Sequence, residues 1–213
     1  MNSYTLRVEY DTDTESPLEW EDGSGWRFCS FSRRHRAFVE PCELGLDSVG
    51  MRRKFACDTA FMLSYHEHGN CAWSLLGGGP RCQWDTVDGA GVLIWQGKPG
   101  DLNKSPAGRR AAAASWLEMY TNWCNGCCYW YSLEEFDSDG ELLRDDSCGG
   151  FIGSDHFKAC LEDEVFSGID ERAEIKVVGD AAGVFSYGKR ARGTLPAARA
   201  DELEAARAVG GGI

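Results

Sequence analysis

The feature that most constrains this chain is a series of short strand-like runs separated by tight turns. Tyr4 to Tyr10 alternates apolar and polar residues, which predicts a strand with one buried face. Four later runs form two pairs, each joined by a turn that contains Gly: 59–66 with 71–76, and 128–136 with 141–146. Such pairs predict β-hairpins, because Gly and Asn adopt the positive φ that a tight turn needs.

Two segments have the three-to-four-residue spacing of a helix with a buried face. The first begins at Ser105-Pro106, a good N-terminal cap, and runs to about Trp123 before Asn125-Gly126 ends it. The second begins at Ser154 and repeats apolar residues at four-residue intervals: Phe157, Leu161 and Val165.

These patterns predict an α+β fold with an antiparallel sheet built from hairpins and two main helices packed on it. Residues 26–31 and 91–95 are expected to be further strands, and 175–178 and 184–187 a last hairpin. With 43% hydrophobic residues the chain has enough material for a core. We expect a single domain over residues 1–190 and a C-terminal helical tail over 191–213.

The charge of the chain is strongly negative. The net charge is −12, and residues 1–179 hold 30 acidic against 17 basic residues. Such a body repels nucleic-acid phosphates and could meet a partner protein with a basic surface, although acidity for solubility alone is the simpler account of the charge. The residues expected to contact a partner are acidic or aromatic: Asp11, Asp13, Glu15, Glu19, Trp20 and Trp84.

The first ten residues contain no charged leader followed by an apolar run, and no window is apolar for the length of a membrane span. We therefore expect a cytoplasmic protein that does not associate with membranes. Its ten cysteines are expected to be free thiols rather than a disulfide framework. No cofactor is expected.

Two groups of residues are candidate metal ligands. Cys124 and Cys127 are closely spaced, but a structural zinc needs four ligands and no second cysteine pair follows. His66 and His68 share one face of a predicted strand, but the Glu that such a pair requires a few residues later is absent. We expect no metal site. The alternative is a metal ion held by ligands from these four residues.

The chain contains no complete catalytic signature. It lacks a nucleophile elbow, a P-loop and a dinucleotide-binding glycine motif. The alternative reading is a cysteine-dependent or metal-dependent enzyme that uses Cys82, Asp85 and Cys148. These residues would converge if the strand near Gly91 paired beside the strand over 141–147.

Residues 33–36 and 52–54 are two short basic segments, here named the basic islands. They support a third and weaker hypothesis about function. Together with nearby Phe side chains they have the composition of a nucleic-acid contact. The acidity of the remaining chain opposes that role, so a solvated loop or internal ion pairs are the expected use of these residues.

Three motifs occur in a fixed order: Glu15-Ser16-Pro17-Leu18-Glu19-Trp20, Cys82-Gln83-Trp84-Asp85 and Asp146-Ser147-Cys148-Gly149-Gly150-Phe151-Ile152-Gly153. Their order and spacing resemble a family of small bacteriophage and plasmid proteins without an established activity. The likeness covers roughly residues 4–165, and it departs at 21–25, where the family has a shorter Asn-Leu-Gly stretch. It implies an accessory protein in a bacterial host cytoplasm that binds host machinery, such as defence proteins, without catalysis.

Overall fold

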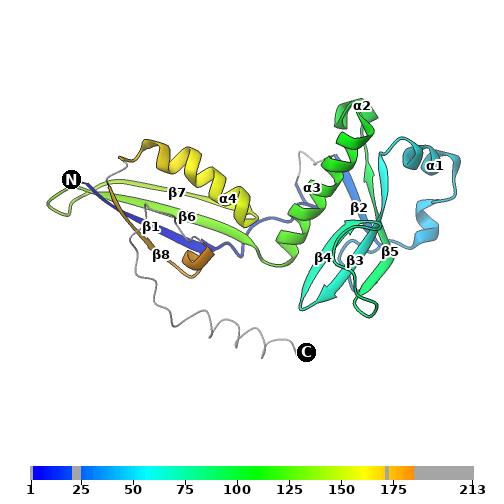
Figure 1. Cartoon of the computed structure of the whole chain (residues 1–213), viewed down its shortest axis with the longest axis horizontal. Helices are drawn as coiled ribbons and strands as arrows, with labels where there is room; N and C mark the ends of the chain where they lie inside the picture. The colour runs from blue at the N-terminus through cyan, green and yellow to red at the C-terminus, as the bar shows by residue number, and fades with distance from the viewer. Residues whose placement is uncertain (1, 21–24, 171–172, 185–213) are drawn as a thin grey trace. The chain divides into compact units, whose positions relative to one another are not determined.

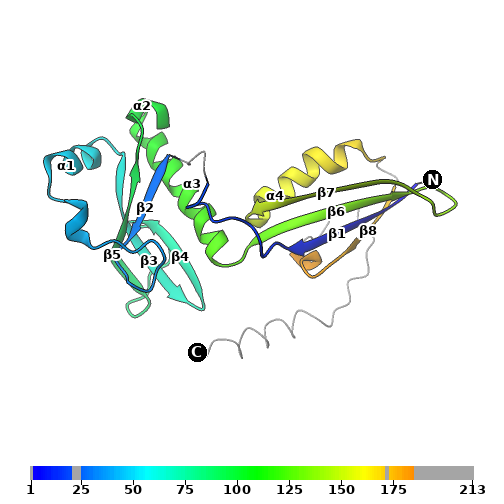
Figure 2. The ribbon, with the colours of Figure 1, turned by 180° about the vertical axis from the view of Figure 1, so that it is seen from behind.

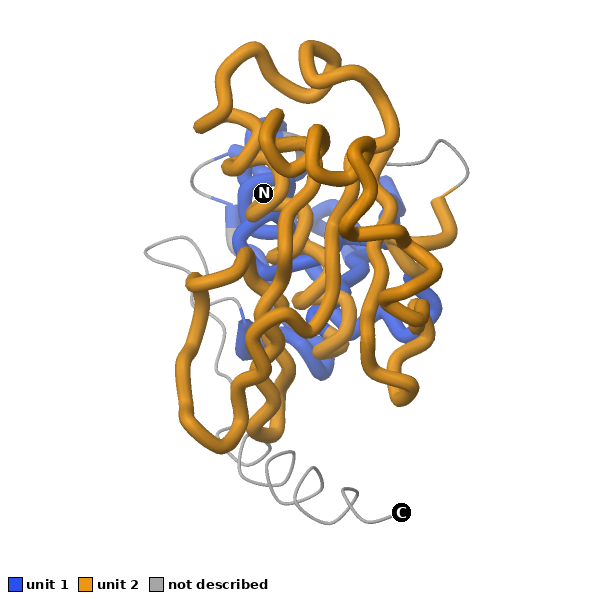
Figure 3. The backbone as a smooth tube through the Cα atoms, turned by 90° about the vertical axis from the view of Figure 1, so that its right-hand side faces the viewer, with its two compact units in different colours: residues 1–14, 127–213 blue, residues 15–126 orange. Residues whose placement is uncertain are grey.

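The computed structural model describes residues 2–20, 25–170 and 173–184. The chain forms two compact units, which Figure 3 shows in different colours. Unit 1 comprises residues 1–14 and 127–213, and unit 2 comprises residues 15–126. Unit 2 is therefore an insertion between the first strand of unit 1 and the remainder of that unit.

Unit 1 contains a four-stranded sheet with the order β7-β6-β1-β8 (Figure 1). Its strands are β1 (Ser3–Tyr10), β6 (Cys128–Phe136), β7 (Leu142–Ile152) and β8 (Glu174–Val178). The β7-β6-β1 part is antiparallel, and the predicted hairpin over 128–146 is confirmed as β6 and β7.

Helix α4 (Ser154–Cys160) covers one face of this sheet and continues as a π-helical turn, η2 (Leu161–Val165) (Figure 1). Phe157 and Leu161 are fully buried, as their spacing predicted. The ring of Phe157 stacks on Tyr129 of β6, with 5.3 Å between the ring centroids. Alternate residues of β1, Leu6 and Val8, complete this core and are also fully buried.

The prediction of a last hairpin is wrong for the residues that the structure describes. Strand β8 pairs in parallel with β1, with Tyr4 opposite Ile175, and Val184 ends a 3-10 helix, η4 (Ala182–Val184). Residues 185–187 lie outside the described residues. The connection from β7 through α4 to β8 allows this pairing, because strands that run in the same direction need a crossover connection, which is usually a helix.

Unit 2 contains a second sheet, antiparallel throughout, with the order β2-β5-β3-β4. Its strands are β2 (Trp26–Ser30), β3 (Ala60–His68), β4 (Asn70–Leu75) and β5 (Thr86–Trp95). The predicted hairpin over 59–76 is confirmed as β3 and β4. It turns at Gly69, whose φ of 79° is in the range that glycine tolerates best.

The two faces of the unit 2 sheet are covered by different helices (Figure 2). Helix α3 (Pro106–Cys124) packs Trp116, Leu117 and Tyr120 against β-strand residues such as Phe28. Its predicted start is confirmed, because Ser105 Oγ accepts a hydrogen bond from the Gly108 amide at 3.0 Å. The opposite face is covered by α1 (Val49–Ala56) and the 3-10 helix η1 (Pro41–Leu44).

Helix α1 was not predicted, because none of its residues is fully buried and it carries three consecutive basic residues. A short helix, α2 (Pro99–Leu102), precedes α3, and the 3-10 turn η3 (Phe166–Gly168) follows η2. The α+β class with antiparallel sheets and packed helices is confirmed.

The expectation of a single domain over 1–190 stays a prediction, since two compact units can still unfold together. The tail over 191–213 lies outside the described residues. Within 2–20, 25–170 and 173–184, no helix combines the length and the apolar character needed to cross a bilayer.

Candidate protein-binding site

The acidity of the chain is concentrated in one unit. Residues 1–14 and 127–184 of unit 1 hold 18 acidic against 5 basic residues, whereas unit 2 holds 13 against 12. Unit 2 is therefore close to neutral, and almost all of the net negative charge belongs to unit 1. A charge of this size raises the local concentration of positively charged partners.

Within unit 1 the densest run of acids is the end of the β6–β7 hairpin. Residues 134–146, here named the acidic hairpin, contain seven carboxylates and one base, Arg144. The carboxylates lie on both strands and in the turn: Glu134, Glu135, Asp137, Asp139, Glu141, Asp145 and Asp146. Arg144 bonds to Asp146 at 3.1 Å, so it neutralises only one of them.

The turn of the acidic hairpin is held by Asp137. Its Oδ1 accepts hydrogen bonds from the amides of Asp139 at 2.8 Å and Glu141 at 2.9 Å. These backbone N–H groups hold the pKa of the Asp137 carboxyl below its usual range. Asp137 therefore contributes a fixed negative charge while it shapes the turn.

Strand β7 is an open edge of the unit 1 sheet. Among the described strands it pairs only with β6, and its residues 142–145 and 147–150 are exposed. Leu142 and Leu143 are 54% and 55% exposed although they are large apolar side chains. An open strand edge presents unpaired N–H and C=O groups to which another strand can bond.

The equivalent edge of unit 2, strand β4, is covered by α3. The amide of Trp73 donates to Thr121 Oγ1 at 3.0 Å, and the amide of Cys71 donates to Asn125 Oδ1 at 2.9 Å. Side chains one helical turn apart thus occupy the positions of a neighbouring strand. No such side-chain cap lies on the outer edge of β7 in the described part of unit 1.

The predicted contact residues are divided between the two units. In unit 1, Asp11 has a structural role: its Oδ1 accepts from the Asp13 amide at 3.0 Å and its Oδ2 from the Gly150 amide at 2.9 Å. It therefore joins the end of β1 to Gly150 of β7, which lies where the register of the β6–β7 pairing shifts. Asp13 itself is exposed and remains available for contact.

In unit 2, Glu19 bonds to Arg36 at 2.9 Å, which neutralises its charge locally. Glu15 is exposed and Trp20 is partly buried. Trp84 is 85% exposed, an unusual position for an indole ring and one that suits contact with another molecule.

The basic islands of unit 2 are partly used inside the protein. Arg33 bonds to Glu40 at 2.7 Å, and Lys54 Nζ donates to the carbonyl of Trp95 at 2.7 Å. With the Arg36 ion pair, these contacts agree with the expectation of internal partners and leave fewer charges for nucleic acid.

The enzyme hypothesis depended on a pairing between the strand near Gly91 and the strand over 141–147, and the described strands do not pair in this way. Strand β5 lies between β2 and β3, and β7 lies beside β6 in the other sheet. Cys82 and Asp85 belong to unit 2 and Cys148 to unit 1. Asp85 instead contacts His68, with 3.2 Å between Oδ2 and Nδ1.

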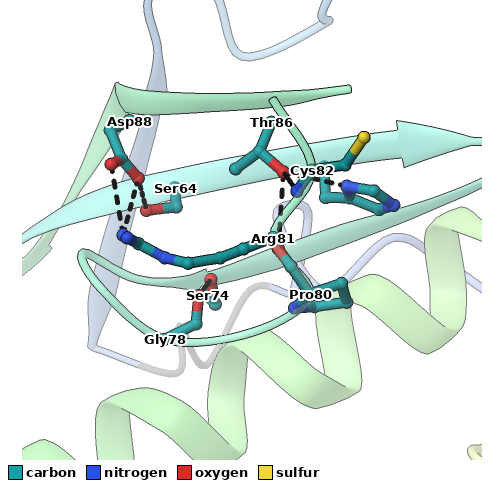
Figure 4. A network of polar contacts seen from close by, with 9 residues as sticks. Ser64, Ser74, Gly78, Pro80, Arg81, Cys82, Thr86 and Asp88 are labelled. Carbon is teal, nitrogen blue, oxygen red and sulfur yellow. Dashed lines mark hydrogen bonds and ion pairs between the residues drawn. The ribbon is translucent and has the colours of Figure 1, made fainter. Parts of the chain in front are cut away.

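Figure 4 shows how the loop around Cys82 is held against the unit 2 sheet. Arg81 contacts both oxygens of Asp88, at 3.3 and 3.1 Å, and Ser64 Oγ donates to Asp88 Oδ1 at 2.6 Å. The Cys82 amide donates to Thr86 Oγ1 at 2.9 Å. These contacts are those of a structural network that orders the loop.

The alternative metal ligands are found in both units or have other contacts. Cys124 belongs to unit 2 and Cys127 to unit 1, and His66 Nδ1 lies 3.0 Å from Thr86 Oγ1. In the described part of the chain, no three His, Cys, Asp or Glu side chains are grouped so that they could hold a metal ion. One thiol–imidazole contact that the sequence did not suggest joins Cys160 to His156, 3.8 Å apart on α4.

The sequence analysis did not single out the acidic hairpin as a binding site. A count of charges in a sliding window would have identified it. Comparison of the chain with protein-family models, curated proteins and solved structures finds no match.

Proposed function

We propose that this protein is a non-catalytic binding module that uses the acidic hairpin of unit 1 to engage a basic surface of another protein. The observation that carries the proposal is the coincidence of seven carboxylates, two exposed leucines and an open strand edge within residues 134–146. Each of these three features alone is common on protein surfaces. Together they offer charge, apolar area and main-chain hydrogen-bonding groups to a partner within one short segment.

The three features supply different parts of the binding energy. The edge of β7 offers main-chain hydrogen bonds to a strand of the partner, a mode known as β-augmentation. Leu142 and Leu143 offer apolar area, and the surrounding carboxylates attract Lys and Arg side chains and repel acidic competitors. The partner that fits is an exposed strand or extended segment rich in basic residues.

The biological context is proposed from the resemblance to phage and plasmid proteins. In that context the module is an accessory protein of a mobile element, and its partner is a component of the host cytoplasm, such as a defence protein. Host proteins that bind nucleic acid present basic surfaces. A carboxylate-rich hairpin is complementary to such surfaces.

The test is affinity capture with three forms of the full chain from bacterial lysate. One variant neutralises the hairpin with Asp139→Asn, Glu141→Gln and Asp145→Asn. A control removes the same charge from exposed sites of unit 2 with Glu43→Gln, Asp47→Asn and Glu118→Gln.

We expect wild type and control to retain one dominant basic partner, with binding that weakens as salt rises, and the hairpin variant to lose it. Equal retention by the hairpin variant and the control would overturn the role of the hairpin. Recovery of nothing above background at low salt would overturn the proposed function.

A further inference from the structure

The C-terminal end of α3 is fastened to strand β4 by one side chain. Asn125 follows the last residue of α3, and its amide makes two hydrogen bonds to the backbone of Cys71. Its Oδ1 accepts from the Cys71 N–H, and its Nδ2 donates to the Cys71 carbonyl, both at 2.9 Å. This paired arrangement fixes the position of residue 71 relative to residues 124 and 125.

The residue before Asn125 is Cys124, so these contacts place Cys124 beside residue 71, and hydrogen bonding between the two thiols is the leading cause of opposite shifts in their pKa values. All ten cysteines are free thiols in the structure; Cys124 is exposed and Cys71 is partly buried. The pair is therefore accessible to a small molecule from solvent. Both residues belong to unit 2, so their proximity depends on one compact unit only.

The hydrogen bond makes the two thiols chemically unequal. Donation from the Cys124 S–H stabilises a thiolate at Cys71, which lowers the pKa of Cys71 and raises that of Cys124. A thiolate is the reactive form of cysteine in exchange with disulfides. Cys71 is thus the attacking group, and Cys124 is the second thiol within reach of the sulfur that Cys71 would carry.

We propose that Cys71 and Cys124 form a reversible disulfide by exchange with low-molecular-weight disulfides, of which glutathione disulfide is the probe used here. The Cys71 thiolate attacks one sulfur of the probe, forms a mixed disulfide and releases one thiolate, which takes a proton from water. Cys124 then loses its proton and attacks the Cys71 sulfur, forming the protein disulfide and releasing the second thiolate, which takes that proton. Two electrons pass from the protein thiols to the probe.

The physical consequence is a covalent link between the edge of β4 and the end of α3. In the reduced protein this contact depends on the Asn125 and Thr121 hydrogen bonds. The disulfide would fix the same contact without changing the surface of unit 1. It is therefore a site of modification separate from the acidic hairpin.

The experiment incubates the full chain with mixtures of reduced and oxidised glutathione, stops exchange with acid and measures intact mass and tryptic peptides without reduction. We expect a species that has lost two hydrogen atoms and a linked peptide that contains residues 71 and 124. Cys71→Ser and Cys124→Ser should abolish the link. These variants keep the Asn125 contacts, which go to the backbone.

One further variant and a second measurement on Cys124→Ser make the result specific. Cys42→Ser, which removes an exposed thiol elsewhere in unit 2, should leave the link unchanged. Cys124→Ser should accumulate the mixed disulfide at residue 71, since no second thiol resolves it. Separate glutathione adducts on residues 71 and 124 in wild type, without a linked peptide, would overturn the proposal, as would a link that joins other cysteines.

Discussion

Replacement of Asn125 by Ala should destabilise unit 2 by an amount that the structure allows us to estimate. The change removes two hydrogen bonds of 2.9 Å to the backbone of Cys71. A hydrogen bond contributes about 1 kcal/mol net to stability, so the loss of both costs about 2 kcal/mol. Residue 71 is only partly buried, so water can bond to the backbone groups of Cys71 that the substitution leaves without a partner. The cost in unfolding free energy therefore stays at about 2 kcal/mol.

Urea denaturation followed by tryptophan fluorescence measures this change. Seven of the eight Trp residues belong to unit 2, so the emission reports mainly on that unit. With a denaturant slope of about 2 kcal/mol per molar urea, the midpoint should fall by about 1 M.

The matched control is Asn70→Ala, which truncates an exposed asparagine on the same strand and should shift the midpoint little. A midpoint for Asn125→Ala that coincides with wild type, or equal shifts for both variants, would refute the view that this side chain fastens α3 to β4.

Three other outcomes are expected. Phe157→Ala should cost about 3–5 kcal/mol in chemical denaturation followed by circular dichroism, because the ring is fully buried and stacks on Tyr129; a cost below about 1 kcal/mol would contradict this packing. Oxidation of Cys71 and Cys124 should raise the unfolding free energy of the chain by about 4 kcal/mol from loop closure, and the Cys71→Ser variant should not respond. The pKa of Asp137 is lowered in the folded protein, so its contribution to folding stability is present above the ordinary Asp pKa and is lost as pH falls through the folded pKa. The NMR chemical shifts of the amides of residues 139 and 141 should follow that titration in wild type but not in Asp137→Asn.

Local elements were predictable because their signals are local. The alternation of Tyr4 to Tyr10 and the cap at Ser105 each depend on a few neighbouring residues, and both are present in the structure. Helix α1 lacks a fully buried side, so no periodicity marks it. Pairing over long separations has no such signal: Val8 lies opposite Tyr131, with all of unit 2 between them in the sequence.

The candidate sites show the same limit. Asp11 looked like a contact residue, but its carboxylate bonds to the amide of Gly150, a partner that only the folded sheet brings close. The proximity of Cys71 and Cys124 likewise depends on how α3 lies along β4. The acidic hairpin could have been found, because its charge density is a property of thirteen consecutive residues, 134–146.

The insertion of unit 2 also determines when each part of the chain can fold during synthesis. All strands of the second sheet are complete once residue 126 has left the ribosome, so that sheet can form while the rest is still being made. Strand β1 emerges before the second sheet, yet its neighbours β6 and β8 are translated only after that sheet. Among the described strands, β1 thus waits longest for its hydrogen-bonded neighbours, and a nascent chain arrested at residue 126 would lack both β6 and β8.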